Sequence, residues 1–333
     1  MLMSTRAKFG IASLLTVGIL THSLRAMGGQ LDQHVRKPAS VRTSEATLGN
    51  SVERDYQELL RVDSSAQQEV DELAQRAEDA RRHGETLLAA ELNQKISLRF
   101  SSVRLAYDVF LRKHSKHALA RIAFGNFLFQ IGEEEEAVKQ WTRATRIDPK
   151  NPDPWNDLAH YYQHRGPIKK AFRNYTKASI LDPDEPVFLW NLATTIYVFR
   201  KDAMEYYGIS EREVFDKAIQ LYRQALKLDP NNFQLATELA EAFYLIKPLR
   251  TTEALQAWNG ALLLAADDFE REGVYLHMGR LELNSGLLDE SRKHLDLVTN
   301  EVYNTVKTRL VRKLENKKSE AGSAPPATSP NFR

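Results

Sequence analysis

Three side chains in the middle of the sequence have the types and the spacing of a metal site. Asp157, His160 and His164 lie within the stretch DPWNDLAHYYQH, and on a helix residues three and four apart share one face. Imidazole and carboxylate groups are ordinary zinc ligands, and a catalytic zinc site needs three of them. Tyrosine follows His160, so the HExxH motif of metalloproteases, with its general base, is missing. A metal-dependent enzyme or metal-binding protein that uses this face is one interpretation of the sequence.

Other catalytic chemistry has little support in the sequence. The chain of 333 residues contains no cysteine, which excludes thiol catalysis, disulfides and cysteine-ligated metal sites. The phosphate-binding loop GxxxxGK[ST], the dinucleotide fingerprint GxGxxG and the nucleophile elbow GxSxG are also missing. We therefore expect a protein that is not an enzyme and that carries no cofactor.

The charge of the chain is close to balanced. The net charge is +2, from 46 basic and 44 acidic residues, but the segment before residue 27 holds Arg6, Lys8 and Arg25 and no acid. The remaining chain is therefore almost neutral. A nucleic-acid-binding protein needs a basic face that displaces counterions, so we expect no nucleic-acid partner.

The first 50 residues are typical of a targeting segment and a linker. Basic residues precede an apolar run over residues 9–20, which suits a signal peptide and is short for a membrane span of ~20 residues. Residues 1–26 are predicted to be a signal peptide or an uncleaved membrane anchor, with residues 9–20 as the tether. Residues 27–50 are predicted to be a flexible linker. The protein is accordingly expected to be exported, periplasmic or associated with the cell envelope.

The next segment has the periodicity of helices. Between Pro38 and Pro149 there is no proline, so long helices are allowed there. Apolar residues at helical spacing predict an amphipathic helix that ends at His83-Gly84. Two further helices are expected over 85–98 and 101–113. Residues 51–117 are therefore predicted to be N-terminal helices or a divergent repeat.

The strongest pattern in the sequence is a repeat of 34 residues. Pro149 and Pro183 are separated by that distance, and so are Ala137 and Ala171, Trp141 and Tyr175, and Ala144 and Ala178. A helix–turn–helix unit of this length resembles the tetratricopeptide repeat family. The segment from Pro152 matches the family pattern of small and large residues throughout, at Trp155, Leu158, Ala159, Tyr162, Ala171, Tyr175, Ala178 and Pro183. The preceding segment matches it from Phe124 to Pro149, with Arg121 in place of the tryptophan.

The resemblance implies an all-α fold, a right-handed solenoid of antiparallel helix pairs over residues 118–300. In the third repeat the closing Pro230 arrives 13 residues late, so residues 199–213 are expected to extend the first helix or enlarge the turn. A fourth repeat carries Trp258, and a degenerate fifth is expected to cap the array. A C-terminal helix is predicted over 301–315 and a disordered tail over 316–333.

The family resemblance also implies a binding surface. Tetratricopeptide repeats bind peptides through certain positions of the first helix of each pair, which line a concave groove. Those positions hold amide, imidazole, aromatic and hydroxyl side chains, which suit an extended peptide. The residues expected there are Asn126, Gln130, Asn156, His160, His164, Trp190, Thr194, Tyr197, Thr237, Glu241 and Tyr244.

The sequence departs from one known variant of this surface. The carboxylate-clamp form of the repeat pairs a lysine with an asparagine one helical turn later. This chain has Asn126, but Ile122 stands at the lysine position, so we do not expect it to bind a chaperone C-terminus. The prediction is a non-enzymatic scaffold or adaptor for a protein or peptide partner, with self-association through the ends of the solenoid as a further expectation.

Overall fold

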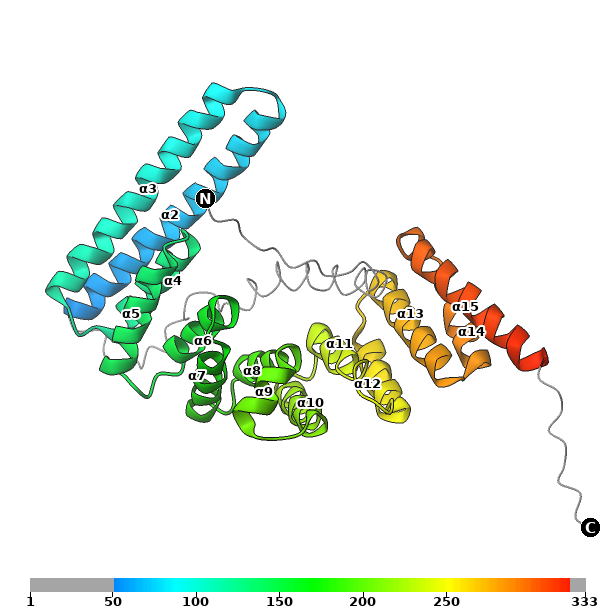
Figure 1. The fold of residues 1–333 in the computed structure, drawn as a ribbon. Coiled ribbons are helices and arrows are strands. Elements are labelled where there is room, and N and C mark those ends of the chain that lie inside the picture. The colour runs from blue at the N-terminus through cyan, green and yellow to red at the C-terminus, as the bar shows by residue number, and fades with distance from the viewer. Residues whose placement is uncertain (1–50, 324–333) are drawn as a thin grey trace, which may run out of the picture. The chain divides into compact units, whose positions relative to one another are not determined.

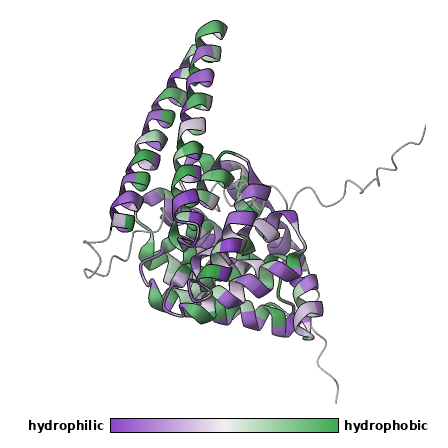
Figure 2. Cartoon of the chain, turned by 90° about the vertical axis from the view of Figure 1, so that its left-hand side faces the viewer, coloured by the Kyte–Doolittle hydropathy of each residue, from purple (hydrophilic) through white to green (hydrophobic). Residues whose placement is uncertain are grey.

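The computed structural model describes residues 51–323, and all regular secondary structure in that range is helical (Figure 1). The helices are α2 (Ser51–Arg82), α3 (Thr86–Lys113), α4 (Ala118–Gln130), α5 (Glu134–Ile147), α6 (Asp153–Arg165), α7 (Ile168–Leu181), α8 (Pro186–Val198), α9 (Arg200–Tyr207), α10 (Glu211–Leu228), α11 (Phe233–Glu241), α12 (Thr251–Leu264), α13 (Asp268–Ser285), α14 (Leu288–Asp296), the 3-10 helix η2 (Glu301–Tyr303) and α15 (Asn304–Ser323). Hydrophobic and hydrophilic residues are mixed along the long helices that are clearly visible in Figure 2, as expected for helices that bury one face. The predicted all-α fold is confirmed.

The chain divides into two compact units, with the boundary after Leu158. In the first unit, α2 and α3 form a long helical pair whose turn contains Gly84, with φ +77°. Leu73, Ala77 and Leu92 pack together between these two helices. The helix end predicted at His83-Gly84 is confirmed.

The predicted division of the next segment into helices 85–98 and 101–113 is wrong, because α3 is continuous. The two serines at the expected break bind within the helix. The hydroxyl of Ser101 donates to the Ser97 carbonyl at 2.9 Å and that of Ser102 to the Leu98 carbonyl at 3.0 Å. Hydroxyl groups that bond to the preceding turn in this way are compatible with an uninterrupted helix.

The first repeat is the pair α4 and α5, which approach each other closely at Gly125. A β-carbon at Gly125 would lie 2.6 Å from Cδ1 of Trp141, so only glycine fits beside this buried indole. Small residues at such positions let two helices approach, and the large neighbour fills the remaining space.

The second unit begins within α6 and contains α7 to α15. Ala159, Ala171, Phe172 and Tyr175 are fully buried and share one core cluster with residues of α8 and α10. These include repeat positions that the sequence pattern identified as packing residues, and the structure confirms that role.

The insertion in the third repeat forms a separate helix, α9, between α8 and α10. Gly208 ends α9 with φ +65°, in the left-handed region that favours glycine. A capping box then starts α10, because the Glu213 amide donates to the Ser210 hydroxyl and the Ser210 amide donates to the Glu213 carboxylate. Of the two alternatives predicted for this insertion, the structure has the enlarged connection and not an extension of the first helix. The connection contains a short helix with its own end and start signals.

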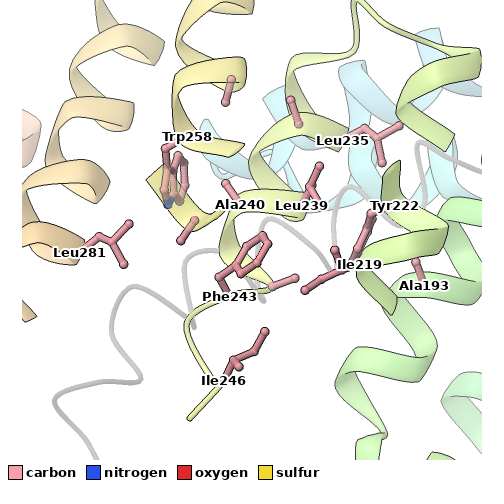
Figure 3. Packing of buried hydrophobic residues seen from close by; sticks show 14 of the residues in the cluster. Ala193, Ile219, Tyr222, Leu235, Leu239, Ala240, Phe243, Ile246, Trp258 and Leu281 are labelled. Carbon is pink, nitrogen blue, oxygen red and sulfur yellow. The ribbon is translucent and has the colours of Figure 1, made fainter. Parts of the chain in front are cut away.

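The fourth and fifth repeats are the pairs α11–α12 and α13–α14. Their shared core contains Trp258, Phe243, Leu239 and Leu281, with Tyr222 from α10 (Figure 3). Gly279 of α13 approaches Leu295 of α14, whose Cγ would lie 2.8 Å from an added β-carbon. The last helix, α15, runs past the predicted end of the C-terminal helix at residue 315.

Several predictions concern residues 1–50 and 324–333, outside the described part of the chain. They are the signal peptide or anchor of residues 1–26, the linker of residues 27–50 and the distal part of the predicted tail. Among the described helices, none combines the length and the apolar character that a membrane crossing requires.

Candidate functional site

In the first unit the predicted surface residues have different roles. Asn126 of α4 accepts a hydrogen bond from the indole N–H of Trp141 at 2.9 Å, so its side chain helps to join the two helices of its repeat. Asn156 of α6 is buried, whereas Gln130 is exposed at the end of α4. Ile122, which stands at the clamp-lysine position, is buried at 3% exposure.

The two histidines of α6 belong to the second unit and lie against each other. The ring centroids of His160 and His164 are 4.8 Å apart in an edge-to-face arrangement. His160 is half-buried and His164 is exposed. Over residues 51–323, no three histidine, aspartate or glutamate side chains gather in a way that could hold a metal ion. The structure therefore gives no support to the alternative interpretation in which Asp157, His160 and His164 bind a metal.

Two predicted surface residues of α8 are buried instead. Trp190 is 3% exposed and Thr194 is 5% exposed, and the Trp190 side chain belongs to the core cluster of the second unit. Both side chains donate hydrogen bonds to one acceptor on α11, which holds them in the core. The Trp190 indole N–H donates to Oε2 of Glu238 at 2.7 Å, and the Thr194 hydroxyl donates to the same oxygen at 3.1 Å.

Glu238 of α11 was missed by the sequence interpretation, and it is the centre of this network. A third donor, the Tyr222 hydroxyl of α10, lies 3.4 Å from Oε2. Burial raises the pKa of Glu238, and the hydrogen bonds from Trp190, Thr194 and Tyr222 act in the opposite direction. The sequence holds one indication of such an acceptor. An indole N–H and a hydroxyl one turn apart on a buried helix both need a hydrogen-bond acceptor.

Glu241 lies one turn further along α11 and has a different environment. Its backbone carbonyl accepts a hydrogen bond from the Tyr197 hydroxyl at 3.4 Å, and its side chain is half-buried. Burial, reinforced by the neighbouring Glu238, raises the pKa of Glu241 to about 7, while Arg280 opposes the shift. Glu241 is thus a carboxyl group that titrates close to neutral pH.

Tyr244 and two residues of α13 complete the arrangement. The Tyr244 hydroxyl and Nδ1 of His277 are 2.7 Å apart, and the Arg280 guanidinium lies 5.1 Å from the centre of the Tyr244 ring. The His277 ring also stacks on Trp258 at 4.5 Å. Burial, helped by Arg280, lowers the pKa of His277 to about 4, so this imidazole is neutral at pH 7.

The remaining predicted residue, Thr237, points back to its own helix. Its hydroxyl donates to the Gln234 carbonyl at 2.8 Å. The structure thus brings together a subset of the predicted residues and adds four others. We refer to the set as the α11 cluster: Trp190, Thr194, Tyr197, Tyr222, Glu238, Glu241, Tyr244, His277 and Arg280.

The α11 cluster has the chemistry of a recognition site. It contains two carboxyl groups, one guanidinium and the rings and hydroxyls of tyrosines, drawn from α8, α10, α11, the turn after α11, and α13. Glu238 is held in place by donors from two other helices, which fixes the position of the α11 backbone on which Glu241 lies.

The comparison with family models supports the repeat architecture. Residues 125–166 and 211–246 match a family model described as TPR repeat. The chain is 32% identical over 112 residues to Hsp70-Hsp90 organizing protein 1 of Glycine max, which covers 33% of this chain and 17% of that protein. It is 24% identical over 153 residues to Superkiller protein 3 of Schizosaccharomyces pombe, covering 46% of this chain and 11% of that protein. The chain therefore spans only a small part of the length of the curated relatives it matches.

Among solved structures, the C-terminal part of a TPR repeat-containing protein from Cytophaga hutchinsonii is similar to this chain. The two are 13% identical with a TM-score of 0.51, and the match covers 74% of this chain and 98% of that one. At this level of identity the similarity concerns the fold alone. It agrees with the helix pairs described above.

Proposed function

We propose that this chain is a tetratricopeptide-repeat protein and that it is a non-enzymatic adaptor, which binds an extended segment of a partner protein. Repeats of this kind present continuous binding surfaces, and the fold by itself does not specify the ligand. The observation that carries the proposal is the α11 cluster, in which α8, α11 and α13 place polar and aromatic side chains next to each other. One of the matched relatives is named as an organizing protein, which agrees with an adaptor role.

The contacts within the α11 cluster suit a peptide rather than a small substrate. Tyr197, Glu241 and Tyr244 are each only half-buried, so they retain surface that a ligand can contact. Tyrosine supplies a large contact area with few rotatable bonds, which is why it is common at protein interfaces. Residues such as Trp190 and Tyr222 support this surface from the core.

Selection of peptides on the full chain tests the proposal. Peptides recovered from a randomised display library would be measured against the wild type, Tyr197→Ala and, as a matched control, Lys177→Ala at an exposed position of α7. We expect roughly tenfold weaker binding to Tyr197→Ala, which corresponds to about 1.4 kcal/mol, and unchanged binding to Lys177→Ala. Selected peptides that bind both variants like the wild type would overturn the proposal.

We also propose that the protein is exported or attached to the cell envelope. The support is the order of basic residues Arg6 and Lys8 followed by the apolar run of residues 9–20. Fractionation of native cells, with N-terminal sequencing of the mature protein, tests this. A new N-terminus near residue 27 indicates a cleaved signal peptide, an intact one in the membrane fraction indicates an anchor, and an intact one in the soluble cell interior contradicts export.

Self-association has one supporting feature, an apolar stripe on α3. Leu87, Leu98 and Leu105 are 82%, 62% and 59% exposed, and with Val109 they lie on one side of the helix. Leu87 and Val109 are equally far from Leu98 in the sequence, so a second copy of α3 packed antiparallel would place each opposite the other. We propose that the apolar stripe of α3 packs against the same stripe of a second copy of this chain. Light scattering of the full chain should show a dimer that Leu98→Glu converts to a monomer; a monomeric wild type excludes it.

A further inference from the structure

The two carboxyl groups of α11 differ in the hydrogen bonds and ion pairs that they form. Glu238 accepts hydrogen bonds from Trp190 and Thr194 and has the Tyr222 hydroxyl nearby. Glu241 has no ion pair with a basic side chain anywhere in the part of the chain that the structure describes. The nearest candidate, Arg280, lies over the Tyr244 ring instead. A half-buried carboxylate without a paired counter-charge is unfavourable, because burial removes water and Arg280, which forms no ion pair with Glu241, compensates only in part.

We propose, building on the peptide-binding function above, that Glu241 binds a basic side chain of the partner peptide, an arginine or a lysine. Tyr197 and Tyr244 would flank that side chain. The ligand would thereby supply the ion pair that no basic side chain of residues 51–323 makes with Glu241.

The surroundings of Glu241 suit a cation better than a neutral or acidic group. The α11 cluster holds two carboxyl groups and one guanidinium, and His277 is neutral at pH 7. Aromatic ring faces attract cations, and the position of Arg280 over Tyr244 shows that this ring can accommodate a guanidinium. Arginine can also bind a carboxylate through two parallel hydrogen bonds.

The backbone at the site is fixed before any ligand arrives. Glu238 connects α11 to α8 through Trp190 and Thr194, and the Tyr197 hydroxyl bonds to the Glu241 carbonyl. A binding group on a fixed backbone loses less conformational entropy when its ligand binds. The interactions of Glu238 therefore favour binding at Glu241.

Binding of a basic side chain at this site should release a proton. A cation beside Glu241 favours the ionised carboxylate and lowers its pKa from about 7. The titratable groups that interact with Glu241 are Glu238 on its own helix, Arg280 on α13, and the hydroxyls of Tyr197, Tyr222 and Tyr244. His277 on α13 lies behind them, at the Tyr244 hydroxyl. Of the neutral groups, His277 has its pKa lowered to about 4 and the tyrosines have theirs raised by burial. Affinity for a basic peptide should therefore fall as the pH decreases from 8 to 6.

Peptide libraries with one fixed residue test the proposal on the full chain. Four fluorescent nonapeptide libraries, randomised except for a central arginine, lysine, glutamate or norleucine, would be compared by fluorescence anisotropy. We expect the arginine and lysine libraries to bind roughly tenfold more tightly than the norleucine library, as one charge-assisted contact predicts. Glu241→Gln should remove that difference and the pH dependence, while Glu205→Gln, an exposed control on α9, should leave both unchanged.

A second variant distinguishes a basic ligand from an acidic one. Arg280→Gln removes the cation that competes with the ligand, so it should strengthen binding of the arginine and lysine libraries. If an acidic group were the true ligand, Arg280→Gln would instead weaken binding of the glutamate library. Thermal unfolding of each variant checks that the repeats remain folded.

The outcomes separate this proposal from the peptide-binding function itself. If Glu241→Gln binds the basic libraries as tightly as the wild type while Tyr197→Ala loses affinity, the peptide surface stands and the basic-side-chain site is excluded. If the glutamate or norleucine library binds as tightly as the arginine library, the site is likewise excluded. If none of the four libraries binds, both proposals fail.

Discussion

Two regions of this chain bury a carboxyl group beside tyrosines, and the two groups have different surroundings. Asp63 of α2 is 7% exposed, and both of its oxygens accept hydrogen bonds, one from the Tyr107 hydroxyl and one from the Gln67 amide. Glu241 of α11 is half-buried and forms no ion pair with any basic side chain of residues 51–323. Burial raises the pKa of both groups.

The difference distinguishes a carboxyl group whose hydrogen bonds are made inside the protein from the one that we propose as a ligand site. Asp63 joins α2 to α3 and has its hydrogen-bonding capacity used internally, so a ligand has nothing to add. Glu241 retains unused capacity at a surface with aromatic neighbours. A raised pKa alone does not distinguish Asp63 from Glu241. The number of hydrogen-bond donors that contact each carboxyl group does.

Replacing each of the two α11 glutamates by alanine, one at a time, should give the largest difference in the free energy of unfolding. Glu238→Ala leaves the Trp190 indole and the Thr194 hydroxyl without their acceptor, and we expect a loss of about 3 kcal/mol in the free energy of unfolding. Glu241→Ala orphans no donor and should cost less than about 1 kcal/mol. Urea denaturation followed by circular dichroism measures both, and hydrogen exchange in α8 should increase only in Glu238→Ala. Equal losses would mean that the two carboxyl groups play the same structural part.

Removal of the tyrosine hydroxyl from the Asp63 pair should have the next largest effect. Tyr107→Phe keeps the buried ring and deletes the donor, so Asp63 retains only Gln67. We expect a destabilisation of about 2 kcal/mol, measured by urea denaturation of the full chain. Tyr206→Phe, at an exposed tyrosine of α9, is the matched control and should change nothing. A neutral result for Tyr107→Phe would show that the Asp63 pair is not needed for stability.

Glu241→Gln should stabilise the free protein, and only at neutral and alkaline pH. The pKa of Glu241 is about 7 in the folded state against an ordinary value of 4.5, so the folded protein binds this proton more tightly than the unfolded chain does. The resulting stabilisation is present below pH 4.5 and is lost as the pH rises to about 7. The glutamine variant does not titrate. At pH 8 it should therefore be about 1–2 kcal/mol more stable than the wild type, allowing for partial exposure, and equally stable at pH 4.5.

The measurement is the urea midpoint of both proteins across this pH range. Glu205→Gln provides the control, since that carboxyl group is exposed on α9. A stability gap that is the same at every pH would mean that the substitution acts through packing rather than through the charge of Glu241.

Much of the fold could be predicted because the repeat is a local pattern. The alternation of small and large residues determines how neighbouring helices pack, so Ala171, Tyr175 and Trp258 are buried where the pattern placed them. Helix α9 was not predicted, although Ser210 and Glu213 are capping-box residues that mark the start of α10. The repeat spacing gives the length of an insertion, but its conformation depends on the residues against which it packs.

The binding surface was less predictable, because it depends on contacts between helices far apart in the sequence. Trp190 occupies a family groove position, yet Glu238, 48 residues later, accepts its indole N–H and keeps it in the core. Asp63 depends in the same way on Tyr107, 44 residues away. A 34-residue period identifies neighbours one repeat away, but it does not identify which polar side chains will pair.

The smallest effect is expected at a carboxyl group that faces solvent. Asp55 of α2 forms an ion pair with Lys113 of α3 at 2.6 Å, and Lys113 and His114 lower its pKa. Water can replace both partners and salt screens the pair, so Asp55→Asn should leave the urea midpoint unchanged at 0.15 M salt. The matched comparison is Tyr107→Phe, which affects a carboxyl group of the same helix pair. If Asp55→Asn lowered the midpoint as much as Tyr107→Phe, exposure would not explain why Asp63 contributes to stability, and the same reasoning would then fail for Glu238 and Glu241.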